Sequence, residues 1–208
     1  MKEEQEYIRD LTEIRSMMER STRFLSLTGW SGIMAGIYAL AGAFFAYRII
    51  YLNKEEVVYN TLEAQQISDS VTKLALLAFT VLVLAIGTAI LLSYKKSRAN
   101  NYKLWNPATR RLLVNLAIPL ITGGLFIIVL FLKGILGLIA PVTLIFYGLA
   151  LLNASKFTFE DVKYLGIMQI ALGLAASYFI GYGLYFWAAG FGMMHIVYGI
   201  YMHLRYEK

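Results

Sequence analysis

The sequence LALLAFTVLVLA, residues 74–85, decides the fold class of this 208-residue chain. Thr80 is its only polar residue, so apolar and polar side chains do not alternate as they do in a membrane-spanning strand. Hydrocarbon offers the backbone no hydrogen bonds, and a continuous apolar run in lipid therefore has to be helical. The stretch belongs to one of six apolar segments close to the roughly 20 residues that cross a bilayer core. These segments are 24–50, 72–94, 112–132, 135–153, 164–181 and 184–204.

The sequence thus predicts an all-α, polytopic membrane bundle of about six transmembrane helices, and the composition agrees. Hydrophobic residues make up 59% of the chain and charged residues only 15%, whereas charged residues are about 25% of a soluble domain. The chain has no cysteine, which excludes disulfides and thiolate metal sites. The formal net charge of +6 is expected of basic cytoplasmic loops. Because no basic patch interleaves with exposed aromatics, no nucleic-acid partner is predicted.

The Lys and Arg residues are distributed unevenly between the two sides of the predicted bundle. If the N-terminus lies inside, the segment 95–111 is an inner loop that carries six Lys or Arg residues and no Asp or Glu. The outer segments then hold only Arg48, Lys54, Lys73 and Lys133. Since basic residues are retained in the cytoplasm, the sequence predicts a cytoplasmic N-terminus and, with six spans, a cytoplasmic C-terminus.

The N-terminal segment, residues 2–23, is densely charged and contains no Gly or Pro. Pairs of opposite charge four residues apart, such as Arg9–Glu13 and Arg15–Glu19, favour a helix there. We expect a cytoplasmic amphipathic helix over 1–23, a transmembrane domain over 24–204 and a cytoplasmic tail over 205–208. Two roles stay open for the helix. It either lies on the membrane and caps the bundle, or it docks a dimer mate or a cytoplasmic or membrane protein partner.

The apolar segments repeat in pairs. Gly32-Ile33-Met34 in the first segment matches Gly166-Ile167-Met168 in the fifth, and a glycine recurs in the even segments at Gly87, Gly148 and Gly199. The pattern predicts three tandem two-helix hairpins over 24–94, 112–153 and 164–204. Small residues permit close packing in lipid. Equivalent faces would meet around a pseudo-three-fold axis, unless the glycines serve unrelated contacts or a homo-oligomer. The predicted packing residues are Gly32, Gly36, Gly166, Gly173 and Gly199.

Three tandem hairpins with a shared glycine near the inner end of the even helices, at Gly87, Gly148 and Gly199, resemble the HdeD-like acid-resistance membrane proteins of bacteria. The resemblance covers the six-helix span in outline, while the N-terminal helix and the long first outer loop depart from that pattern. It implies a small protein of the bacterial-type inner (plasma) membrane without known catalysis. It transfers no functional residues to this chain.

Few side chains inside the apolar segments are suited to catalysis. All 13 Asp and Glu residues lie outside these segments, which excludes carboxylate proton relays, carboxylate cation sites and a Ser-His-acid set. His195 and His203 are eight residues apart, a helix rise of about 12 Å, which is too far for shared chelation. The sequence contains no P-loop or dinucleotide fingerprint. We therefore predict no enzymatic activity, no metal and no cofactor.

Four polar residues within the apolar segments form a candidate pocket: Asn115, Gln169, His195 and Tyr198. They either join helices by hydrogen bonds or line a pocket for a substrate, a lipid or a sensed proton. The predicted function is a non-enzymatic membrane module that binds a partner, senses or responds to stress, with lipid headgroups attracted to the basic loop 95–111. The alternative is a small transporter or channel whose pocket lies around the fifth and sixth segments.

The predicted orientation can be tested with reporter fusions. We expect a fluorescent protein fused after Arg110 to fluoresce and a phosphatase fused there to be inactive, because the six basic residues of 95–111 hold this loop in the cytoplasm. Fusions after Lys133, in a predicted outer turn, should give the opposite pattern. An active phosphatase after Arg110 would overturn the orientation.

Overall fold

The computed structural model describes residues 7, 24, 26–52, 69–99 and 105–207, and among these it contains helices and no strand. The predicted N-terminal helix over 1–23 lies outside the described residues except for Tyr7. The long helices are α2 (Gly29–Tyr47), α3 (Asp69–Ala99), α4 (Pro107–Leu132), α5 (Ile139–Ala154) and α6 (Val162–Tyr178). A last rod joins α7 (Gly183–Trp187), the π-helix η4 (Ala188–Met194) and α8 (His195–Tyr206). The short pieces are η1 (Arg48–Leu52), η2 (Leu136–Leu138) and η3 (Ser155–Phe157).

Five helical stretches are long and apolar enough to cross a membrane. They run over Gly29–Ile50, Val71–Ala99, Pro107–Leu132, Leu136–Phe157 and Gly183–Tyr206. The prediction of an all-helical bundle is therefore confirmed for the described residues, and these five stretches agree with the prediction of a membrane protein. The segment predicted as the fifth span forms α6, whose 17 residues stand at the lower limit of the roughly 17–25 that span a bilayer. Five spans rather than six are shown by length and composition.

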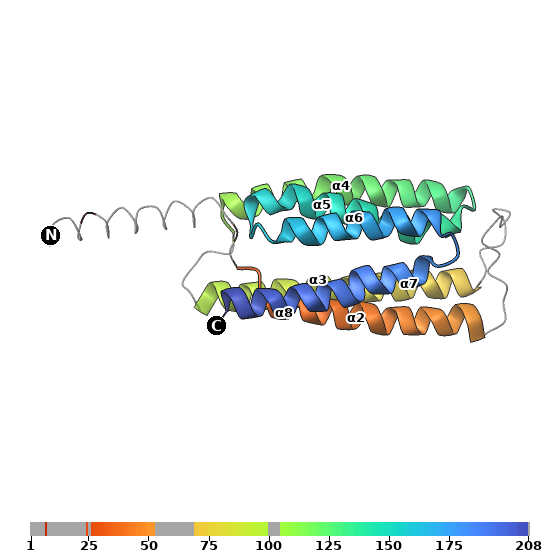
Figure 1. Cartoon of the computed structure of the whole chain (residues 1–208), viewed down its shortest axis with the longest axis horizontal. Helices are drawn as coiled ribbons and strands as arrows, with labels where there is room; N and C mark the ends of the chain where they lie inside the picture. The colour runs from red at the N-terminus through yellow and green to blue at the C-terminus, as the bar shows by residue number, and fades with distance from the viewer. Residues whose placement is uncertain (1–6, 8–23, 25, 53–68, 100–104, 208) are drawn as a thin grey trace.

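The helices form two layers that run side by side (Figure 1). One layer holds α4, α5 and α6, and the other holds α2, α3 and the rod of α7, η4 and α8. In the first layer α5 packs against both α4 and α6, and in the second α2 packs against both α3 and α8. The helices of the third predicted hairpin have different main partners, since α6 packs on α5 and α8 packs on α2. Each of these contacts joins one odd-numbered and one even-numbered predicted segment, the fifth with the fourth and the first with the sixth. The predicted meeting of equivalent faces around a three-fold axis is therefore not what these contacts show.

Glycines set the distance between α5 and α6. A Cβ atom built on Gly148 would lie 2.6 Å from the carbonyl oxygen of Gly166, and one built on Gly166 would lie 2.8 Å from that of Gly148. Two turns away, a Cβ atom on Gly173 would lie 2.9 Å from the carbonyl oxygen of Pro141. Because any larger residue would push the helices apart, the glycines are what allow these two backbones to touch.

The contact between α2 and α8 repeats this arrangement. Gly148 of α5 touches Gly166 and Ile170 of α6, and in the same way Gly199 of α8 touches Gly29 and Ile33 of α2. Gly173 of α6 touches Pro141 and Ile145 of α5, and in the same way Gly36 of α2 touches Gly192 and Ile196 of the last rod. Gly29, rather than Gly32, therefore stands at the position of Gly166, three residues from the predicted alignment. Gly32 lies against the Cα atom of Gly199. All five predicted packing glycines lie at these two helix contacts.

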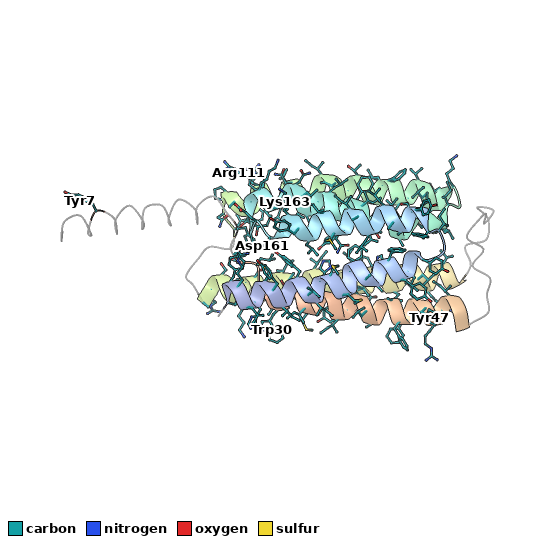
Figure 2. All side chains as sticks on the ribbon, viewed as in Figure 1. Tyr7, Trp30, Tyr47, Arg111, Asp161 and Lys163 are labelled. Atoms are coloured by element: carbon teal, nitrogen blue, oxygen red, sulfur yellow. The ribbon has the colours of Figure 1, made fainter. Side chains whose placement is uncertain are left out.

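Lys and Arg side chains gather at one end of the bundle, called the basic end below. Figure 2 shows Arg111, Asp161 and Lys163 at this end and Tyr47 at the opposite end. The chain order explains the gathering, because α2, α4 and α6 begin there, whereas α3, α5 and α8 end there. The described basic residues of this end are Lys95, Lys96, Arg98, Arg110, Arg111, Lys156, Lys163 and Arg205.

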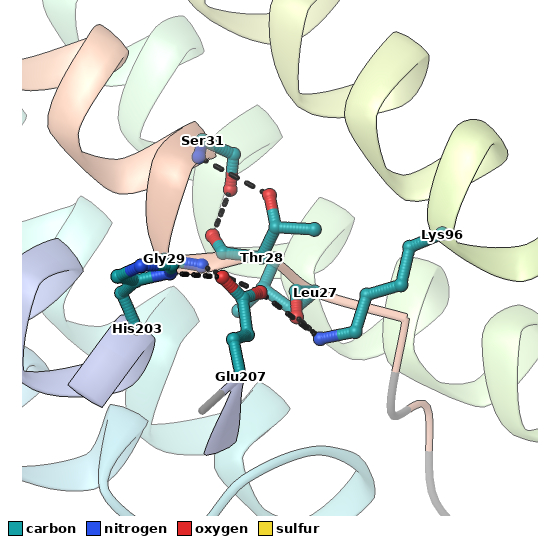
Figure 3. A network of polar contacts seen from close by, with 7 residues as sticks. All are labelled: Leu27, Thr28, Gly29, Ser31, Lys96, His203 and Glu207. Atoms are coloured by element: carbon teal, nitrogen blue, oxygen red, sulfur yellow. Dashed lines mark hydrogen bonds and ion pairs between the residues drawn. The ribbon is translucent and has the colours of Figure 1, made fainter. Parts of the chain in front are cut away.

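Glu207 ties three helix ends together at the basic end (Figure 3). Its Oε1 atom accepts hydrogen bonds from the Gly29 backbone N–H at 3.2 Å and from Lys96 Nζ at 3.1 Å, and its Oε2 atom lies 2.7 Å from His203 Nδ1. Burial acts to raise the pKa of Glu207, but the hydrogen bonds from His203, Lys96 and the Gly29 backbone, together with the charge of Lys96, lower the pKa overall. The carboxylate also stands at the first turn of α2, where the helix dipole favours a negative charge.

Asp161 makes a second tie at the same end, between the start of α6 and the end of α8. Its carboxylate accepts hydrogen bonds from Arg205 Nη1 at 3.1 and 3.2 Å and from the Tyr206 hydroxyl at 2.6 Å. Nearby, Thr158 Oγ1 donates to the Phe24 carbonyl oxygen at 2.8 Å, and Phe24 packs with Leu112 and Ala154, so the segment before α2 is held against the first layer. Hydrogen bonds thus connect the two layers at the basic end.

Replacing Gly148 by alanine should destabilise the bundle. The new Cβ atom would lie 2.6 Å from the Gly166 carbonyl oxygen, and backbone atoms cannot move aside as a side-chain end can. We expect a loss of about 1–3 kcal/mol in the free energy of unfolding, measured by thermal or denaturant unfolding in detergent micelles. The matched control is Ala171→Val on α6, which adds more atoms at an exposed position and should change little. Equal losses in both variants would contradict the packing role of Gly148.

Candidate functional site

A buried polar cluster lies where the two layers meet. It contains Tyr147 of α5, Gln169 of α6, and Gly190 and His195 of the last rod. Gln169 is 0% exposed and His195 is 6% exposed. The structure therefore brings together two of the four residues predicted for a polar pocket, and it does so across the interface between the layers.

The hydrogen bonds define the protonation of the imidazole ring. His195 Nδ1 lies 3.0 Å from the Gly190 carbonyl oxygen, which only accepts, so Nδ1 carries a proton. In the neutral ring Nε2 is then an acceptor, and the Tyr147 hydroxyl donates to it at 2.8 Å. Gln169 Nε2 donates to the same Gly190 carbonyl at 2.8 Å. One backbone carbonyl thus receives hydrogen bonds from two layers.

The cluster depends on the local backbone of η4. In a π-helix the backbone hydrogen bonds run from residue i to i+5, and such single turns often mark functional sites. A Cβ atom built on Gly190 would lie 2.5 Å from both Gln169 Oε1 and Leu144 Cδ2. Glycine at this position is therefore what admits the Gln169 side chain to the carbonyl it binds.

Aromatic rings close over the imidazole. Phe191 stacks on His195 with an interplanar angle of 17° and a centroid distance of 5.8 Å, and the Tyr147 ring lies 5.0 Å from the Phe191 ring. Two buried polar atoms have no hydrogen-bond partner among the described residues, Gln169 Oε1 and the Tyr198 hydroxyl. Tyr198 packs instead against an apolar cluster that includes Leu151 and Met202. It does not hydrogen-bond to His195 in the described part of the chain.

Asn115, the fourth predicted pocket residue, lies elsewhere. Its Nδ2 atom donates to the Arg111 carbonyl oxygen of the same helix at 2.8 Å. It lines an open cavity of about 590 Å³ at the N-terminal end of α4, together with Trp105, Arg110 and Arg111. The prediction that Asn115 shares a site with His195 is therefore wrong, because α4 presents Asn115 at the basic end of the bundle.

Two members of the cluster, Tyr147 and Gly190, are absent from the predicted pocket. Tyr147 has a signal in the sequence, since Tyr147-Gly148 and Tyr198-Gly199 occupy the same position in the predicted repeat. The packing of α5 on α6 turns the first tyrosine into the cluster, while the second faces apolar side chains. Gly190 contributes through its backbone carbonyl, and no residue pattern marks a free carbonyl group.

The cluster acts as a hydrogen-bonded junction between helices. Its side chains use most of their polar groups on one another and on the Gly190 carbonyl. Within the described ranges no group of three or more His, Asp or Glu side chains is placed to hold a metal ion. Such interhelical bonds in membranes are worth about 0.6 kcal/mol each on average.

Comparison of the chain with protein-family models, with curated proteins and with solved structures gives no match. The resemblance to HdeD-like proteins is therefore still a prediction. The function has to be argued from the geometry of this chain alone.

Removing the Tyr147 hydroxyl should weaken the junction. In Tyr147→Phe the Nε2 atom of His195 loses its donor in a buried setting, and we expect a loss of about 0.6–1.7 kcal/mol in the free energy of unfolding in micelles. Tyr178→Phe is the control, because Tyr178 is 81% exposed. In a His195→Phe background, the Tyr147→Phe change should have little further effect. Additive losses would show that the two side chains are not coupled.

Proposed function

We propose that the chain is a non-enzymatic, multi-pass protein of a bacterial-type inner membrane, and that its transmembrane domain binds a protein partner within the bilayer. The observation that carries the proposal is a pair of open glycines, Gly87 on α3 and Gly124 on α4. A Cβ atom built on either one would have no atom within 4 Å, the α-helix's own local backbone aside. Their counterparts in the other helices, Gly148, Gly199, Gly173 and Gly36, all touch a neighbouring helix.

The side chains around these open glycines are exposed as well. Leu84 is 47% exposed and Leu91 is 70% exposed on α3, and Ile121 and Leu125 are 62% and 61% exposed on α4. Exposed leucine and isoleucine side chains make favourable contacts with lipid tails, whereas a glycine has no side chain to make such contacts. A glycine within a helix destabilises it by roughly 0.5–1 kcal/mol relative to alanine. Two such positions facing outward favour a helix that comes close to them.

The proposed topology has six spans with both termini in the cytoplasm. The position of α6 beside α5 supports a sixth span, since the 17 residues of α6 match the 16 of α5, which lies within one of the membrane-spanning stretches (Figure 1). The basic end would face the cytoplasm. Arg110 and Arg111 would then stand at the level of the lipid headgroups, where anionic lipids attract them. The N-terminal segment 1–23 offers a second surface to a cytoplasmic partner.

Transport through the polar cluster has weaker support. Gln169 and His195 spend their donors on Gly190, and Tyr147 donates to His195, so a solute would have to displace three protein contacts. The open cavity of about 590 Å³ described above lies at the N-terminal end of α4 and includes none of these residues. A role for the cluster in holding the two layers together agrees better with these contacts.

The proposal can be tested with a photoreactive amino acid at Leu84 in intact membranes. We expect a protein adduct at Leu84, because this side chain lies one turn from the open Gly87, and loss of the adduct when Gly87 is changed to leucine. The control position is Leu82, which is 54% exposed but lies about 200° around the helix from Leu84. Adducts with lipid alone at both positions would refute a protein partner on this face.

A further inference from the structure

We infer that the partner is a second copy of this chain, and that α3 of each copy packs on α4 of the other at Gly87 and Gly124. The inference rests on the proposed function and names the occupant of the open faces. It follows from the two glycine contacts already described, because α3 and α4 carry the two halves of the same contact.

The first half is a motif on α2, α4 and α6, which are the first, third and fifth predicted segments, and it is called the odd-segment motif below. In α6 it is Gly166, Ile170 and Gly173, with spacings of four and three residues. The same spacings occur in α2 as Gly29, Ile33 and Gly36, and in α4 as Ala117, Ile121 and Gly124. In α6 these residues touch α5, and in α2 they touch the last rod. In α4 Ile121 is 62% exposed and Gly124 has nothing near it.

The second half is a motif on α3, α5 and α8, which are the second, fourth and sixth predicted segments. In α5 and α8 it consists of an isoleucine three residues before a glycine, Ile145 with Gly148 and Ile196 with Gly199. In α3 the corresponding residues are Leu84 and Gly87. Ile145 and Ile196 contact the second glycine of the odd-segment motif, which is Gly173 or Gly36. Gly148 and Gly199 contact the isoleucine of that motif. Leu84 and Gly87 therefore fit Gly124 and Ile121 in the same register.

Within one chain this third contact is not made. The two helices belong to different layers, α3 with α2 and α4 with α5 (Figure 1). Each copy thus presents both halves of the contact at once, one on each layer. A two-fold axis along the membrane normal would join α3 to α4 of the partner and α4 to α3 of the partner. It would also keep the paired helices antiparallel, as α5 and α6 are.

A foreign protein would have to supply its own copy of one half and would leave the other half open. A second copy fills both faces with two contacts of a kind that the fold already uses twice. The open faces carry the residue pattern of an interface whose geometry the α5–α6 and α2–α8 pairs define. This self-complementarity is what selects the second copy as the occupant.

Cysteine cross-linking tests the contact, and the natural absence of cysteine makes it clean. In the α5–α6 contact a Cβ atom on Gly166 would lie 3.2 Å from the Cβ atom of Leu151. The same register pairs Ala117 with Ile90, close to the roughly 3.5–4.5 Å Cβ separation of disulfides. Two differently tagged copies, one with Ile90→Cys and one with Ala117→Cys, are expressed together and oxidised in native membranes.

We expect a disulfide-linked species carrying both tags, its loss when Gly87→Leu or Gly124→Leu is added, and none when Leu82→Cys replaces Ile90→Cys. Gly87→Leu should not lower the thermal stability of the single chain, since Gly87 touches nothing within it and a glycine inside a helix is less favourable than a residue with a side chain. A chain with both cysteines that links only within itself would overturn the second copy. So would a protein adduct at Leu84 that contains another protein and no second copy, although the proposed function would then stand. Absence of both the linked species and any adduct would refute both.

Discussion

The close approach of two backbones at glycine is the constraint on which the fold depends. Lipid tails are as apolar as leucine, so helices gain nothing by hiding leucine from lipid and associate through close packing and hydrogen bonds. In α5 and α6 this approach occurs at Gly148 and Gly166, and in α2 and α8 at Gly199 and Gly29. Each layer of the bundle is built around one such contact, and the remaining helices, α3 and α4, lie at the outer sides of the layers.

Hydrogen bonds and apolar contacts connect the two layers, the apolar ones in a cluster that includes Leu151, Leu165 and Met202. Midway along the bundle the Gly190 carbonyl receives Gln169 from one layer and His195 from its own, and Tyr147 completes the chain of contacts. At the basic end the carboxylate of Asp161 binds the end of α8. The two kinds of contact meet in η4, where the absence of a side chain at Gly190 is also what makes room for the amide of Gln169.

This division of contacts is the reason we propose the open faces of α3 and α4 as the surface that binds a partner. The predicted internal repeat has three pairs of matching helix faces, and two of these pairs are packed in the structure, α5 on α6 and α2 on α8. The third pair, around Gly87 and Gly124, has no neighbouring helix within the described part of the chain. A repeat protein in lipid can in this way keep one copy of its own packing contact for association with another chain.

Much of this architecture follows from the sequence alone. The long apolar runs fix the helical class, because the backbone of a membrane segment has to satisfy its own hydrogen bonds. The recurrence of Gly148 and Gly199, and the polar residues Gln169 and His195 at otherwise apolar positions, are visible as pattern and chemistry. They predict tight packing and a buried polar contact without saying which helices provide the two sides.

Only the tertiary structure decides the partners. Apolar sequences align in several registers with similar scores. Only the contacts themselves therefore show that Gly29, and not Gly32, is the residue equivalent to Gly166. The carbonyl group that joins the polar cluster belongs to a backbone turn, and side-chain patterns carry no trace of it. That Gly87 and Gly124 stand open is likewise a property of the assembled layers, because an open glycine and a packed one are the same letter in the sequence.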